Sequence, residues 1–165
     1  MKSTKFITIE EIIEIHDKII EKYGGEHGIL NKGILEFAVY WVNSNPRRSV
    51  LWKVAVLLRD IVSGHPFVDG NKRTGFEVAD TILKAKGYRF TTTQSEILRF
   101  LIKLAKEGME IEEIVKWLKD NTKRVSKMPR KRRKREKSKL RPEYEKAFEE
   151  SMEEFDSLLR ELAKL

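Results

Sequence analysis

Apolar residues recur at a spacing of three to four in six segments of the first 121 residues, and this pattern predicts an all-α domain. The first predicted helix begins after Thr8, where Glu11 completes a capping-box pattern, and it ends at Gly24. The other five predicted helices cover residues 32–42, 50–63, a stretch from about 71 to 86, 94–106 and 110–121. Short extended pieces near Lys5 and at residues 88–92 are candidates to pair with each other.

A separate amphipathic pattern occupies residues 142–165. Its apolar positions follow one another at spacings of 4, 3, 4 and 3, and they are Phe148, Met152, Phe155, Leu159 and Leu162. Pro142 near the first turn and acidic residues early in the segment favour a single helix. Because such a helix is only marginally stable alone in water, we expect it to bind either the protein's own body or a second copy as a homodimeric coiled coil.

Charge divides the chain into three regions. Residues 1–121 hold 19 basic and 17 acidic residues, residues 122–141 hold 12 and 1, and residues 142–165 hold 3 and 8. The net charge of +8 therefore comes mostly from a predicted basic linker at 122–141, between a domain at 1–121 and the terminal helix. The linker has no interleaved aromatic residues, so any nucleic-acid binding through it should be weak, unspecific and sensitive to salt.

Composition excludes several classes of protein. The sequence has no apolar run of about 18 residues and no leader-like beginning, which predicts a cytoplasmic protein without a membrane contact. The absence of cysteine excludes disulfides and thiol catalysis. Two of the three histidines, His16 and His27, show no zinc spacing and are predicted to be structural or surface residues.

The most informative segment is His65 to Thr74, which reads HPFVDGNKRT and leads into the fourth predicted helix. Backbone N–H groups of Gly70, Asn71 and Lys72 at the start of this helix should form an anion site. First helical turns normally carry acids, yet this turn carries Lys72 and Arg73, and two cations at a positive helix end require an anion. Phosphate fits best, because arginine and lysine both bind its oxygens.

Two further side chains of this segment suit phosphate chemistry. Asp69 is a candidate ligand for Mg²⁺, which usually takes one or two protein carboxylates and completes its shell with phosphate oxygens and water. His65 is the natural general base for a hydroxyl nucleophile, because its reference pKa lies near neutrality. Each residue alone is more often a turn residue, but their combination favours a functional site.

These residues resemble the signature of the Fic/Doc family: His-Pro-Phe, two residues, Gly-Asn, then Gly or Lys, then Arg. Upstream, residues 9–29 carry the helix, the His16-Asp17 pair and the Tyr23-Gly24-Gly25 run that open such proteins. With Lys72 at the variable position and Thr74 after the arginine, the chain is similar to the death-on-curing (Doc) toxin branch. The resemblance covers about residues 5–121 and implies a Fic-fold helical bundle.

The resemblance also implies roles for these residues. His65 would take the proton of a target hydroxyl, Asp69 would hold Mg²⁺, and Gly70, Asn71, Lys72 and Arg73 would bind the phosphates of ATP. Members with lysine at the position of Lys72 are expected to act as protein kinases, whereas members with glycine there transfer AMP. The implied target is a serine, threonine or tyrosine of a translation factor, such as elongation factor Tu or its counterpart.

The sequence departs from the AMP-transferring pattern at Phe76, where that pattern has a second arginine. It also lacks the inhibitory Ser/Thr-xxx-Glu-Gly/Asn motif of self-restrained members, so restraint must come from an antitoxin or from the chain's own terminal helix, which is similar to an antitoxin's neutralising helix. Two alternatives to phosphate transfer remain at this stage: an AMP transferase, and a catalytically silent module that the linker tethers to nucleic acid.

Overall fold

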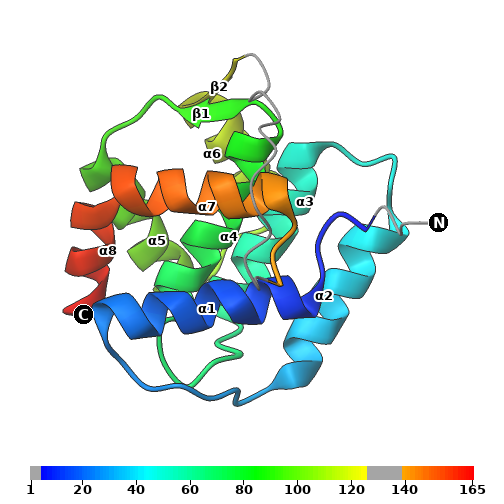
Figure 1. The fold of residues 1–165 in the computed structure, drawn as a ribbon. Coiled ribbons are helices and arrows are strands. Elements are labelled where there is room, and N and C mark those ends of the chain that lie inside the picture. Colours follow the sequence, from blue (N-terminus) through cyan, green and yellow to red (C-terminus); the bar gives the residue numbers. More distant parts are fainter. Residues whose placement is uncertain (1–4, 126–138) are drawn as a thin grey trace.

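The computed structural model describes residues 5–125 and 139–165 as a bundle of helices around one central helix (Figure 1). The first half of the bundle contains α1 (Ile9–Tyr23), α2 (Lys32–Ser44), α3 (Val50–Leu58) and its π-helical continuation η1 (Arg59–Ser63). The second half contains α4 (Asn71–Ala85), α5 (Gln94–Glu107), α6 (Ile111–Asn121), α7 (Pro142–Glu154) and α8 (Asp156–Ala163). The all-α prediction is confirmed. Within these described residues, no helix has the length and apolar character needed to cross a bilayer.

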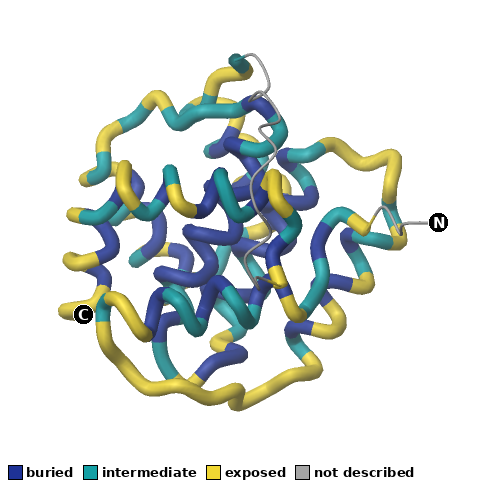
Figure 2. The backbone as a smooth tube through the Cα atoms, viewed as in Figure 1, coloured by how far each residue is buried: buried dark blue, intermediate teal, exposed yellow. Residues whose placement is uncertain are grey.

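Helix α4 is the centre of the bundle and contacts α1, α3, α5, α7 and α8. Every residue from Arg73 to Lys84 is buried, so this helix has no solvent-facing side over that length (Figure 2). A helix buried all round needs neighbours on every face. Elements from both ends of the chain, including the tail helices α7 and α8, supply that cover.

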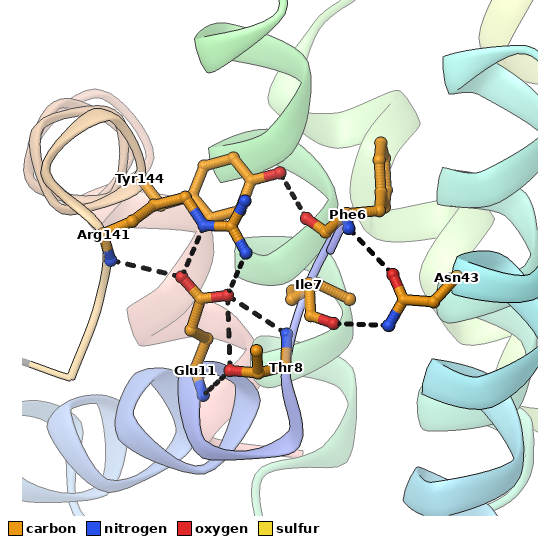
Figure 3. A network of polar contacts seen from close by, with 7 residues as sticks. All are labelled: Phe6, Ile7, Thr8, Glu11, Asn43, Arg141 and Tyr144. Carbon is orange, nitrogen blue, oxygen red and sulfur yellow. Dashed lines mark hydrogen bonds and ion pairs between the residues drawn. The ribbon is translucent and has the colours of Figure 1, made fainter. Parts of the chain in front are cut away.

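The predicted capping box at the start of α1 is confirmed and has a second use. Thr8 Oγ1 accepts the backbone N–H of Glu11 at 3.1 Å, and Glu11 Oε1 accepts the N–H of Thr8 at 3.1 Å. The same buried carboxylate binds Arg141, whose Nη2 and Nε donate to its two oxygens at 2.7 and 2.9 Å (Figure 3). Such charge-assisted two-point bonds are among the strongest in proteins, so they tie the start of α7 to the start of α1.

The predicted pairing of residues near Lys5 with residues 88–92 is wrong. Strand β1 (Tyr88–Phe90) instead pairs antiparallel with β2 (Thr122–Arg124), with Tyr88 opposite Arg124. Strand β2 thus occupies the first residues of the segment predicted to be a linker. Most of the remaining linker, residues 126–138, lies outside the described part of the chain.

Side chains explain why the N-terminal segment does not join a strand. Phe6 donates its N–H to Asn43 Oδ1 at 2.8 Å, and Asn43 Nδ2 donates to the carbonyl of Ile7 at 2.9 Å. Tyr144 on α7 donates its hydroxyl to the carbonyl of Phe6 at 2.6 Å (Figure 3). These backbone groups are therefore satisfied by helices α2 and α7 instead of by a strand.

The tail forms two helices instead of the predicted one, because Phe155 leaves the helical conformation at φ −105° and ψ 22° and separates α7 from α8. Its ring packs edge-on against Phe76 of α4, with ring centroids 4.9 Å apart. The apolar stripe is buried against the chain's own domain, with only Met152 partly exposed. A coiled coil between two tails would need these same side chains.

Charged groups are also buried where α7 covers α4. Lys84 pairs with Asp80 at 2.5 Å and with Glu154 at 2.7 Å, and Ser151 donates its hydroxyl to Glu77. Burial raises the pKa of the Glu77 carboxyl well above its usual value, and the neighbouring Asp80 adds to this shift. Burial also raises the pKa of Asp80, although Lys84 opposes that shift. Both carboxyls therefore hold a proton more tightly in the folded chain.

We expect Glu77→Gln to flatten the pH dependence of stability. A carboxyl whose folded pKa is raised stabilises the fold fully below its unfolded pKa, and this contribution is lost as pH rises through the folded pKa. Gln keeps the shape and carries no charge, so the variant should gain stability relative to the native chain as pH rises. Urea unfolding between about pH 4 and 8 measures this. Glu153→Gln, on the exposed side of α7, is the control, and equal slopes for all three proteins would contradict the burial argument.

Candidate active site

The motif loop is anchored in the core by its aromatic residue. Phe67 is fully buried, and the side chain of Asn71 holds its backbone from both sides. Asn71 Oδ1 accepts the N–H of Phe67 at 2.9 Å, and Asn71 Nδ2 donates to its carbonyl at 3.0 Å. The Asn71 amide is thereby used for loop geometry, which leaves its backbone N–H for a ligand.

The segment between α1 and α2 lies alongside the motif loop and bonds to it. Leu30 donates its N–H to the carbonyl of Pro66 at 2.7 Å, and Val68 donates to the carbonyl of Gly28 at 3.0 Å. These two bonds form an antiparallel bridge between Ile29 and Phe67. Figure 1 shows this segment running below the bundle from α1 to α2, beside the loop that precedes α4. The segment between α1 and α2 therefore supports the motif loop through backbone hydrogen bonds.

His16 supports the motif loop from inside the bundle. Its ring is buried, stacks on Phe67 at a centroid distance of 3.8 Å and 5° between planes, and places Nε2 2.8 Å from the carbonyl oxygen of Asp69. Its Nδ1 lies 3.4 Å from a carboxylate oxygen of Asp17. The sequence indicated a structural or surface histidine, but nothing in the spacing indicated this contact, which joins residues 53 positions apart.

All six candidate site residues line one cavity of about 110 Å³. They are His65, Asp69, Gly70, Asn71, Lys72 and Arg73. Val68 and three tail residues, Leu162, Ala163 and Leu165, complete the lining. Periodicity did not reveal this tail contribution, because the pattern of the terminal helix says nothing about which face of the domain it covers.

The start of α4 has the features of an anion site. Gly70 precedes the helix in the left-handed region, at φ 78°, and offers no side chain to cap the first turn. The N–H groups of Asn71, Lys72 and Arg73 have no acceptor among the described residues, and the first turn contains no acidic residue. The N–H of Gly70, predicted to be free, instead donates to Asp69 Oδ1 at 2.8 Å. The backbone N–H groups without an acceptor are therefore those of residues 71–73 instead of the predicted residues 70–72.

The charged groups of Lys72 and Arg73 differ in the contacts that they make. The Lys72 ammonium forms no ion pair or hydrogen bond within the part of the chain that is described, whereas Arg73 is buried and donates Nη1 to the carbonyl of Gly24 at 2.9 Å. Burial lowers the pKa of Arg73, and the nearby Asp69 carboxylate opposes this shift. Arg73 Nη2 lies 3.6 Å from Asp69 Oδ1. Arg73 is thus a cation held by protein contacts at the pocket wall, whereas no described residue holds the Lys72 ammonium.

Asp69 is the acid of the pocket. Its side chain is 47% exposed, and its Oδ2 accepts the N–H of Glu26 at 3.3 Å. A Cβ atom at Gly25 would lie 2.6 Å from the same oxygen, so only glycine fits beside the carboxylate. Among residues 5–125 and 139–165, no group of three or more histidines, cysteines and acids is arranged so that it could hold a metal ion. A single carboxylate suits Mg²⁺ only where phosphate oxygens and water supply its other ligands.

His65 has an unusual backbone conformation at φ 52°, which makes it the one described residue other than glycine with a positive φ. Side chains rarely adopt this region, and such strain is concentrated at functional sites. His65 is exposed and has no hydrogen-bond partner among the described residues. Its ring can accept a proton from a hydroxyl that enters the pocket beside the anion site.

We expect His16→Phe to loosen the motif loop. The new ring keeps the stack on Phe67 but leaves the Asp69 carbonyl without its partner, which should cost about 1–3 kcal/mol. Thermal unfolding would measure the loss, and the N–H groups of Leu30 and Val68 should exchange with deuterium faster. His27→Phe is the matched control, because His27 is exposed and contacts the same Asp17 oxygen at 3.3 Å. If His16→Phe and His27→Phe show the same unfolding temperature and the same exchange rates, His16 does not support the motif loop.

The motif lies in the part of the chain that is similar to known proteins. A model described as "Fic/DOC family" matches residues 6–83, which contain the whole motif. "Toxin Doc" of Mycolicibacterium smegmatis is 40% identical over 73 residues, 39% of this chain and 54% of that relative. "Protein adenylyltransferase Fic" of Drosophila mojavensis is 29% identical over 144 residues, 73% of this chain and 28% of that relative. The chain thus matches about half of one relative and about a quarter of the other, and its similarity to the Fic/DOC family model is confined to residues 6–83.

Proposed function

We propose that this chain is a Doc-type phosphotransferase that moves the terminal phosphate of ATP to a hydroxyl of a target protein. The observation that carries the proposal is the single pocket that combines His65 with Asp69, Lys72, Arg73 and the free N–H groups at the start of α4. The name of the mycobacterial relative supports a toxin, and the name of the Drosophila relative supports transfer to a protein. The resemblance to the Doc branch suggests a translation factor, such as elongation factor Tu or its counterpart, as the target.

Each pocket residue has a role in the proposed reaction. His65 takes the proton of the target hydroxyl as its oxygen forms a bond to the terminal phosphorus and the bond from that phosphorus to ADP breaks. Lys72, Arg73 and the free N–H groups hold the phosphate oxygens. Asp69 would hold Mg²⁺, which when bound neutralises charge on the phosphates.

Phosphate transfer is favoured over AMP transfer by two residues. Lys72 is an unpaired cation at the position where AMP-transferring relatives carry glycine and accommodate a phosphate. At Phe76, where those relatives carry a second arginine, the side chain is 2% exposed and packs against Phe155, so it offers no phosphate contact. AMP transfer is the second candidate, because the name of the Drosophila relative states that activity. A silent module is disfavoured, because His65, Asp69 and Arg73 are all retained.

We also infer that the end of α8 restrains the site. A cavity of about 110 Å³ is small beside ligand pockets, which usually enclose about 300–1,000 Å³, and Leu162, Ala163 and Leu165 form part of its lining. A nucleotide therefore requires α8 to shift outward. Polar contacts hold the other end of α8, where Tyr23 donates its hydroxyl to Asp156 at 2.8 Å. Restraint of this kind would act within one molecule and need no inhibitory glutamate.

Labelled ATP tests the reaction. We expect transfer from ATP labelled at the γ position and none from ATP labelled at the α position, when the chain is incubated with Mg²⁺ and a bacterial translation extract. Mass spectrometry should then find a phosphate-sized adduct on a hydroxyl residue. His65→Ala should lower the transfer rate by about 100- to 10,000-fold with nucleotide affinity nearly unchanged. An AMP-sized adduct would establish the second candidate, and full activity in the variant would remove His65 from the mechanism.

Release of α8 tests the restraint. We expect Leu162→Asp to free the end of α8, because a carboxylate is costly at this 5% exposed position, and to tighten ATP binding as the pocket opens. Isothermal titration with ATP and Mg²⁺ would show a lower Kd, and the transfer rate should rise. Glu161→Ser is the control on the same turn, since Glu161 is 60% exposed and does not line the pocket. Equal affinity in the two variants would show that α8 is only a structural cover.

A further inference from the structure

An apolar surface begins beside the site and extends along α2. It is formed by five exposed residues, which we name the apolar ridge: Ile29, Leu30, Phe37, Tyr40 and Val68. Among the described residues, the only other large hydrophobic side chain with comparable exposure is Leu165. Phe37, Tyr40 and Leu30 are 58%, 70% and 69% exposed, which is costly for side chains of this size unless a partner covers them.

The ridge is continuous from the motif loop to α2. Val68 lies against Gly28, where a Cβ atom would be 2.9 Å from its Cγ2, and Ile29 is bridged to Phe67. Leu30 then follows Ile29 and leads into the first turn of α2. Along α2, the ring of Phe37 lies 5.8 Å from that of Trp41, and Tyr40 is one turn beyond Phe37.

A cavity of about 320 Å³, large enough for one bulky side chain, adjoins the ridge at Phe37. Its lining residues come from the start of α2 and from the turn that ends η1: Asn31, Gly33, Ile34, Phe37, Asp60 and Gly64. Gly64 is the covalent neighbour of His65. A side chain bound in this cavity would therefore belong to a polypeptide that passes directly beside the proposed general base.

His65 is exposed, so a hydroxyl can reach its ring from outside the bundle. The cavity that contains His65 is also lined by Leu162 and Ala163 at the end of α8 and by Leu165 just beyond it, so the tail occupies part of its border. We therefore expect a protein that brings a hydroxyl to His65 to approach over the segment at 24–31 and the start of α2, where Figure 2 shows mostly exposed residues below the bundle. The ridge occupies this approach.

We propose that the apolar ridge binds the polypeptide that carries the acceptor hydroxyl, and that the cavity beside Phe37 takes an apolar side chain of that polypeptide. The inference rests on the proposed function and adds a sequence preference to it. The bound side chain should lie within about three residues of the modified one, because an extended chain spans roughly 3.3 Å per residue and Gly64 adjoins His65. Acceptors without an aromatic or long aliphatic residue near the hydroxyl would bind poorly.

The test uses Phe37→Ser in the full chain, with Glu36→Ser as the matched control on an exposed, uncontacted position of the same helix. Transfer from γ-labelled ATP to the proteins of a bacterial translation extract is compared with ATP affinity and with slow hydrolysis of ATP to ADP. We expect Phe37→Ser to lower protein transfer by about 10- to 100-fold through KM, as loss of a buried large side chain implies, with affinity and hydrolysis within about twofold of the control. Peptide mapping should place an apolar residue near each modified hydroxyl.

The possible results separate this inference from the proposed function. If the native chain transfers no phosphate, the proposed function fails, and the docking role fails with it. If the native chain transfers phosphate and Phe37→Ser behaves as Glu36→Ser does, only the docking role is overturned. A change from dimer to monomer in Phe37→Ser, with transfer unchanged, would also overturn it and assign the ridge to self-association.

Discussion

The complete burial of α4 is the constraint on which the rest of the structure depends. This helix carries the motif residues at its start, and from Arg73 to Lys84 it meets other elements on every side. A helix in such a position cannot tilt or unwind without disturbing the whole core. The chemistry proposed here needs that rigidity, because the free N–H groups of the first turn and the Arg73 guanidinium must point at one spot before a ligand arrives.

The burial of α4 also explains why the tail is part of the fold. Helix α7 covers the face of α4 that carries Glu77, Asp80 and Lys84, three residues that would be ordinary surface residues if the helix were exposed there. Their carboxyls and ammonium group are satisfied partly by Ser151 and Glu154 of α7. Removing α7 would expose an apolar face and separate these pairs, so the tail cannot be described as a simple removable inhibitor.

Local signals in the sequence predicted much of the fold, and the failures involve contacts between distant residues. The capping box of Thr8 and Glu11 and the helix end at Gly24 depend on neighbours within one or two turns. The partner of strand β1 was mispredicted because Asn43 and Tyr144, which are distant in sequence, form hydrogen bonds with the backbone of residues 6 and 7. This segment is therefore not available to pair with β1. The break at Phe155 was hidden because the apolar spacing continues across it while the ring turns toward Phe76.

The same distinction holds at the candidate site. The motif residues are consecutive, so their joint position at a helix start followed from the sequence, whereas the contact of His16 with Asp69 and the approach of Leu162 required the folded chain.

Phe76 stands at the position where the AMP-transferring pattern has a second arginine, and it links the site to the tail. An arginine at this buried place would need an anion or a carboxylate partner, because burying an unpaired cation is costly. Phenylalanine instead extends the apolar core toward Phe90 and Phe155, with ring centroids 5.8 and 4.9 Å away. The aromatic contact fixes the junction of α7 and α8, and this junction determines where α8 ends. Under the proposed function, the residue at the position of the second phosphate-binding arginine of AMP-transferring members is thus also the residue that packs against the junction of α7 and α8.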